Sequence, residues 1–117
     1  MKRFPVADSF QADCVVSEAA RAGQIYHVVR NASGGAVLTP IARYFVWHPE
    51  FVEGFHKHWR VDCFVHQHKL APDPMSLGEA LVAALVREQL CAEPIWMSAH
   101  KSDELKGKAY GEVFSDD

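Results

Sequence analysis

Apolar and polar residues alternate with a period of two in two parts of the chain, and this pattern predicts two β-strands. Residues 24–30 are rich in β-branched and aromatic side chains. The odd positions of residues 59–67 form an uninterrupted apolar face: Trp59, Val61, Cys63 and Val65. Their even positions are mostly polar. We therefore expect 59–67 to be a half-buried strand with one polar face exposed to water.

The segment after residue 30 predicts a hairpin. Residues 31–35 (Asn-Ala-Ser-Gly-Gly) supply Asn and Gly, which tolerate positive φ and suit a tight connection to a return strand at 36–38. Pro40 lacks an amide hydrogen, so the return strand is expected to lie at a sheet edge or to stop there. Residues 41–47 fit a helix that starts at Thr39-Pro40, but the Tyr-Phe-Val-Trp run favours a strand, which we prefer.

An amphipathic helix is predicted at 76–91. Ser76 and Glu79 match a capping box at its start. One stripe of the helix is apolar: Leu77, Ala80, Leu81, Ala84 and Leu85. Val82 and Val86 widen this stripe, which indicates that the helix packs against a sheet. Residues 95–99 are expected to form a final strand.

These elements predict an α+β fold: a mostly antiparallel sheet of four to five strands with one long apolar helix (about 76–91) packed on one face. The length of 117 residues suits a single domain. Within 1–117 we expect an irregular N-terminal lead-in (1–11) and a polar, loose C-terminal tail (100–117). The expected core consists of Ile25, Val29, Val37, Trp59, Val61, Val65, Leu81, Leu85 and Ile95.

Composition and charge narrow the class of protein. The 12 Lys and Arg against 15 Asp and Glu give a formal net charge of −3, which argues against nucleic acid as the partner. The chain has no apolar stretch long enough to span a membrane and no signal-peptide pattern at its start. Its three cysteines are widely spaced, as in a cytoplasmic protein with reduced, buried thiols.

Four of the seven histidines lie in two His-x-His pairs, His56/His58 and His66/His68. On a continuous strand, His58 and His66 would lie about 26 Å apart at about 3.3 Å per residue. Zinc–nitrogen bonds measure only about 2.0–2.1 Å, so the four histidines do not form one shared site. A single pair could bind zinc or another transition metal if a third ligand came from elsewhere. More often such histidines form a polar, titratable surface, and then no cofactor is expected.

No Gly-rich phosphate loop, nucleophile elbow or His-Glu-x-x-His motif is present, so no catalytic residue is assigned and the interpretation leans against an enzyme. The preferred hypothesis is a small stand-alone cytosolic binding protein that acts by stoichiometric contact with a larger protein or complex. Regulators and inhibitors encoded by phages and mobile elements have this outline. The candidate partner-binding residues are Trp47, Phe51, Lys57 and Arg60.

Two alternatives stay open. The first is a metal-binding protein or metal-dependent enzyme that uses one His-x-His pair. The second is a nucleic-acid accessory protein, in which the aromatic and basic residues of 43–47 and 57–60 would stack on single-stranded bases. A homodimer through an exposed sheet edge is compatible with each of these functions.

Overall fold

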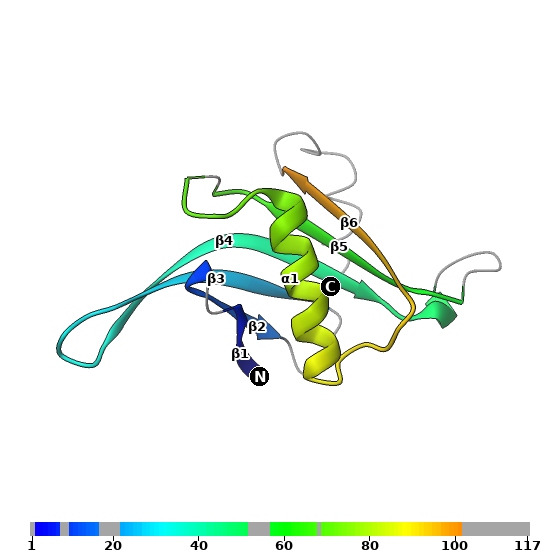
Figure 1. Cartoon of the computed structure of the whole chain (residues 1–117), viewed down its shortest axis with the longest axis horizontal. Helices are drawn as coiled ribbons and strands as arrows, with labels where there is room; N and C mark the ends of the chain where they lie inside the picture. The colour runs from blue at the N-terminus through cyan, green and yellow to red at the C-terminus, as the bar shows by residue number, and fades with distance from the viewer. Residues whose placement is uncertain (1, 8–9, 17–21, 52–56, 68, 102–117) are drawn as a thin grey trace.

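A computed structural model describes residues 2–7, 10–16, 22–51, 57–67 and 69–101 of the chain. Six strands form one sheet in the order β1-β2-β3-β4-β5-β6, and the helix α1 crosses one of its faces (Figure 1). The strands are β1 (Lys2–Ala7), β2 (Ala12–Val16), β3 (Ala22–Arg30), β4 (Ala36–Trp47), β5 (Trp59–Val65) and β6 (Ile95–Lys101), and the helix is α1 (Pro74–Arg87). The α+β prediction is confirmed, with six strands rather than four to five.

The first five strands pair with their sequence neighbours in antiparallel fashion, whereas β5 and β6 are parallel. A parallel pair needs a long crossover, and α1 supplies it. The crossover closes at the start of β5, where the amide of Trp59 donates to the carbonyl of Pro94 at 3.0 Å. The last three elements therefore form a β-α-β unit attached to an antiparallel sheet. Among the described residues, no helix is both long and apolar enough to cross a membrane.

Strand β4 passes through Pro40 without stopping, and residues 41–47 are strand, as preferred. Its register against β3 shifts between the pairs Ile25↔Ala42 and Tyr26↔Pro40, which leaves Ile41 as the extra residue of a β-bulge. The Ile41 carbonyl accepts hydrogen bonds from the amides of His66 and Gln67, at 2.9 and 3.1 Å. Because β5 pairs with residues 42–47 of β4, Pro40 lies in a part of β4 that, among the described strands, pairs with β3 alone.

The helix starts two residues earlier than the sequence pattern predicts, and Asp73 rather than Ser76 is its N-cap. The Asp73 carboxylate accepts hydrogen bonds from the amides of Met75 and Ser76 at 3.1 and 3.2 Å. A hydrogen bond from the Ser76 hydroxyl, followed by these two amide bonds, lowers the pKa of Asp73. Pro74 occupies the first helical turn, where a missing amide hydrogen costs nothing. The capping box was therefore the wrong start signal.

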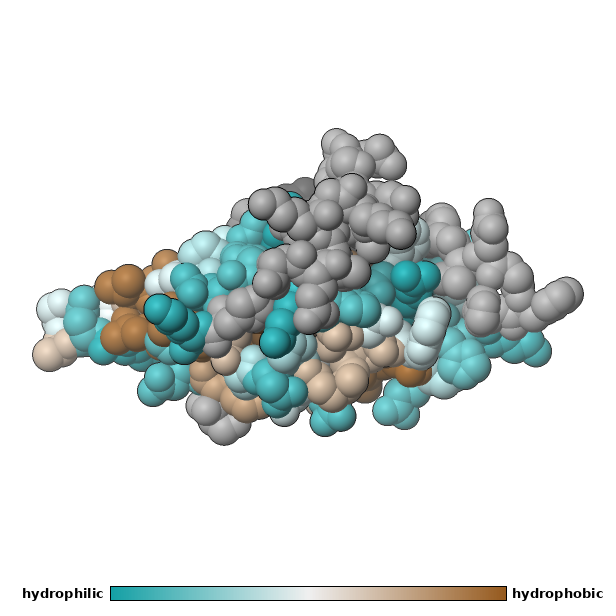
Figure 2. Space-filling view, turned by 90° about the horizontal axis from the view of Figure 1, so that it is seen from above, coloured by the Kyte–Doolittle hydropathy of each residue, from teal (hydrophilic) through white to brown (hydrophobic). Residues whose placement is uncertain are grey.

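The core lies between α1 and the sheet, and most of its predicted members are fully buried: Ile25, Val61, Val65, Leu81 and Leu85. Trp59 and Ile95 are partly buried at its margin. The prediction is wrong for Val29 and Val37, which are 50% and 59% exposed. They pair across the hairpin of β3 and β4, which extends past the region that α1 covers (Figure 1). Figure 2 shows the apolar surface that results at the end of this hairpin.

The expected irregular lead-in at 1–11 is also wrong, because Lys2–Ala7 forms β1 at the sheet edge. Its alternating residues Phe4 and Val6 are buried against the core. Contacts with the end of α1 hold the strand, including a 2.6 Å hydrogen bond from Arg87 Nη2 to the Pro5 carbonyl. At the other end, β6 continues to Lys101. The rest of the expected tail, 102–117, lies outside the described residues.

All three cysteines are free and buried, as predicted. The Cys14 thiol donates a 3.0 Å hydrogen bond to the Tyr44 hydroxyl, and Cys63 pairs with Tyr44 across β4 and β5. Burial raises the pKa of Cys14 and of Cys63 to about 12, and that of Cys91 to about 11. The pKa of Tyr44 is raised for the same reason. These thiols are held protonated and unreactive in the folded protein.

This burial predicts loss of stability in alkali. The thiols ionise near pH 9.0 when unfolded but near pH 12 or 11 when folded, so the unfolded chain binds fewer protons above pH 9. Between its unfolded and its folded pKa, each such thiol should lower the free energy of unfolding by about 1.4 kcal/mol per pH unit. Urea denaturation between pH 8 and 10.5 measures the effect. A double variant, Cys14→Ala with Cys63→Ala, should show a shallower slope, and an equal slope would contradict the assignment.

Candidate functional site

The candidate site lies on the sheet face opposite α1, at the end where β4 finishes and β5 and β6 begin. Pairing aligns Trp47 of β4 with Arg60 of β5, and Arg60 with Trp96 of β6. Residues paired in this way project from the same face of a sheet. Three strands therefore bring two tryptophans and an arginine side by side, which we call the Trp47–Arg60–Trp96 stack.

The arginine of this stack lies between the two indole rings. Arg60 Cζ is 5.3 Å from the ring centroid of Trp96 and 5.9 Å from that of Trp47. Both distances fall within the range of a cation–π interaction. Trp96 is 53% exposed, and the Arg60 side chain is 37% exposed. The stack is therefore an ordered aromatic and cationic group that solvent can reach.

The buried carboxylate of Asp62 orients two side chains of the stack. It is only 2% exposed, and its Oδ2 accepts a 2.9 Å hydrogen bond from Trp47 Nε1. Arg60 Nε lies 3.1 Å from the same oxygen and donates a 3.3 Å hydrogen bond to the other, Oδ1. One buried carboxylate thus fixes the orientation of both side chains by charge-assisted hydrogen bonds.

The prediction of a water-exposed polar face on β5 is wrong at two positions. Asp62 and Phe64, both at even positions, are each 2% exposed. Aromatic packing accounts for this burial: the rings of Phe45 and Trp47 lie 4.5 Å apart, and Phe64 stacks on His100 at 5.7 Å. Asp62 binds Trp47 and Arg60. Cys63 points to the helix face, as expected.

Two of the four predicted partner-binding residues come together in the stack, Trp47 and Arg60. Lys57 is exposed just before β5. Phe51 ends a 3-10 turn (Pro49–Phe51), and its side chain lies outside the described part of the structure. Trp96 was missed. Alternation in 95–101 places Trp96 opposite the apolar positions of that strand, but nothing in the sequence reveals the parallel pairing with β5.

The described histidines do not assemble a metal site. His58 and His66 are exposed and lie just beyond opposite ends of the continuous strand β5. The separation of the two His-x-His pairs was predicted on the assumption of such a continuous strand. His56 and His68 lie outside the described residues. His48 packs edge-on against Trp59, with ring centroids 4.7 Å apart. Within the described ranges, no three His, Cys, Asp or Glu side chains are placed to hold a metal ion.

Comparison of the chain with protein-family models, with curated protein sequences and with solved structures gives no match.

Proposed function

We propose that this chain is a small stand-alone binding protein that acts by stoichiometric contact with a larger protein or complex, and that the Trp47–Arg60–Trp96 stack is the centre of its contact surface. The observation that carries the proposal is an exposed tryptophan beside an arginine that a buried carboxylate holds in place. A binding protein of this kind needs no catalytic activity, because it would regulate or inhibit its partner by contact alone.

The residue types support this assignment. Tryptophan and arginine are the side chains most enriched among the few interface residues that dominate binding energy. A surface whose side chains are already ordered loses less conformational entropy when a partner binds. The Asp62 anchor supplies that order for Trp47 and Arg60, and the ring of Trp96 completes the group.

The geometry also favours a type of group on the partner. Arg60 contacts Asp62 through Nε, and within the described residues its two Nη groups make no hydrogen bond, so they can pair with acceptors of a partner. A carboxylate or a main-chain carbonyl beside an apolar side chain would pair with Nη and cover the Trp96 ring. We therefore propose that the partner presents an acidic or carbonyl-rich, partly apolar patch. Action in the cytoplasm belongs to the same proposal, since the three free thiols suit a reducing compartment.

The variant Trp96→Ala should lose the partner. Truncating such a central residue typically costs at least 2 kcal/mol, which is about a 30-fold loss of affinity. Quantitative affinity capture from host lysate would compare the wild type, Trp96→Ala and Met75→Ala, and calorimetry on the captured partner would give stoichiometry and affinity. Met75 is 51% exposed at the start of α1, away from the stack, and its variant should bind normally.

Thermal melting of the two variants separates lost binding from lost folding. A partner that Trp96→Ala retains with wild-type affinity would overturn the assignment of the surface. A lysate that yields no partner at low salt would count against a binding protein altogether.

Single-stranded nucleic acid is the second candidate, because Trp96 beside Arg60 also offers a stacking platform. The net charge of −3 opposes it. Capture repeated after nuclease treatment distinguishes the two: a protein partner persists, whereas a nucleic-acid complex disappears.

A further inference from the structure

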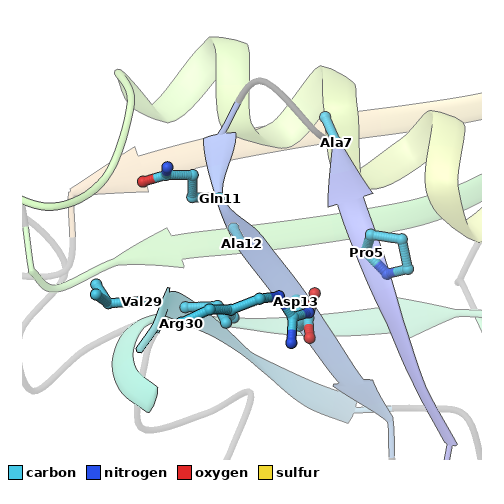
Figure 3. Close-up of a pocket in the computed structure, with 8 residues that line it drawn as sticks. Pro5, Ala7, Gln11, Ala12, Asp13, Val29 and Arg30 are labelled. Atoms are coloured by element: carbon cyan, nitrogen blue, oxygen red, sulfur yellow. The ribbon is translucent and has the colours of Figure 1, made fainter. Parts of the chain in front are cut away.

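A pocket of about 370 Å³ lies beside the end of β1, the start of β2 and the end of β3 (Figure 3). Its lining combines polar groups with the apolar side chains of Pro5, Ala12, Val28 and Val29. Its volume is at the small end of the range for ligand sites. The pocket is remote from the stack, because β3 pairs here with the first half of β4 rather than with the end that carries Trp47.

The pocket carries one uncompensated positive charge. Asp13 lines it, but its carboxylate is neutralised by Arg3, whose Nε lies 2.8 Å from Asp13 Oδ2. Arg30 also lines the pocket and is exposed. Among the described residues, Arg30 has neither an ion-pair partner nor a hydrogen-bond partner for its side chain. The charge of this site therefore suits an anionic ligand.

An open stretch of sheet edge borders the same pocket. The pairing of β2 with β3 ends at Ala12↔His27, followed by one hydrogen bond from the Val28 amide to the Gln11 carbonyl at 2.7 Å. The Asn31 amide points to the other side, toward the Gly35 carbonyl at 3.0 Å. Because main-chain groups alternate along a strand, those of Arg30 point to the same side as those of Val28. Within the described ranges, no strand pairs with Arg30 on that side.

We propose that this pocket binds an extended peptide segment that carries a carboxylate. The segment would continue the line of β2 beside Val28 and Arg30, and its main chain would pair with the free N–H and C=O of Arg30. Its acidic side chain would form an ion pair with the Arg30 guanidinium, while the next side chain along the segment, an apolar one, covers the exposed Val29 on the other face of the strand. Strand addition of this kind gains affinity from the main chain and specificity from side-chain pockets. The site is separate from the Trp47–Arg60–Trp96 stack and does not depend on its function.

Selection of random nonapeptides on the purified full-length protein tests the proposal. We expect the enriched peptides to share an acidic position flanked by β-branched or aromatic residues. Titration of one such peptide, followed by amide chemical shifts, should move the resonances of Gln11, Val28 and Arg30. Arg30→Gln should weaken binding about tenfold, as should Glu→Gln at the acidic position of the peptide.

Two control variants test whether the peptide occupies the Arg30 pocket. Lys57→Gln removes an exposed positive charge elsewhere, and Trp96→Ala alters the stack; both variants should bind the peptide with wild-type affinity. Enrichment of no peptide, loss of the acidic preference, shifts confined to another surface, or unchanged binding by Arg30→Gln would each overturn the proposal. Equal shifts at the same amides with sodium acetate alone would also overturn it, because the site would then recognise a free carboxylate rather than a strand.

Discussion

Leu81→Asp should leave the protein unfolded at 25 °C. Leu81 is fully buried in the middle of α1 and packs in the core against the sheet. Loss of a buried leucine side chain alone costs about 2–5 kcal/mol. An unpaired carboxylate in the same place adds several kcal/mol of desolvation. The total is comparable to the whole stability of an ordinary domain, which is about 5–15 kcal/mol.

Far-UV circular dichroism and urea denaturation at pH 7 measure this effect. Ala83→Asp is the matched control, because it introduces the same charge on the exposed side of the same helix. Its cost should stay below about 1 kcal/mol, in line with helix propensity. A soluble Leu81→Asp variant that melts cooperatively near the wild-type temperature would contradict the placement of α1 on the sheet.

Gly23→Ala should destabilise the protein by about 3 kcal/mol, at the upper end for an overpacked core. A Cβ at this position of β3 would lie 2.4 Å from the Tyr44 hydroxyl and 2.5 Å from the Val15 carbonyl oxygen. Tyr44 is held by its hydrogen bond with Cys14, and Val15 belongs to the main chain of the neighbouring strand. Relief would therefore require β2 and β3 to move apart.

The midpoint of urea denaturation reports this change. Adding Tyr44→Phe removes the nearer atom, so the double variant should recover part of the loss relative to the sum of the single variants. Gly35→Ala is the control, since its Cβ would meet only the exposed side chain of Asn31 at 3.3 Å. If Gly23→Ala unfolds at the wild-type midpoint, the close approach of Tyr44 to β3 is wrong.

The sequence predicts those parts of the fold that local periodicity determines. Apolar and polar alternation predicted β5, and the Asn and Gly residues of 31–35 predicted the β3–β4 hairpin. The apolar stripe predicted α1 to within a few residues of its observed ends. Short or interrupted patterns did not suffice: Pro5 obscured β1, although Phe4 and Val6 alternate correctly. The exposure of Val29 and Val37 depends on where α1 ends relative to the hairpin, and that is a property of tertiary packing.

The candidate site was predictable only in its separate parts. Trp47 and Arg60 were identified separately, as an aromatic and a cationic candidate for partner binding. Their contact depends on the β4–β5 register, and Trp96 joins them through a parallel pairing that no local signal encodes. The burial of Asp62 follows from the same assembly, since it requires an aromatic layer contributed by several strands. The pocket at Arg30 likewise arises from the point at which β2 stops pairing with β3.

The β-α-β crossover also has a consequence for how the chain folds. Strands β1 to β5 follow one another in antiparallel order, so their contacts can form between near neighbours in sequence. The β5–β6 pair instead joins residues 59 and 95, a separation of 36 positions. Closing so long a loop costs more chain entropy and slows folding. During synthesis the antiparallel part can assemble first, and Trp96 can reach Arg60 only after the last strand has been made.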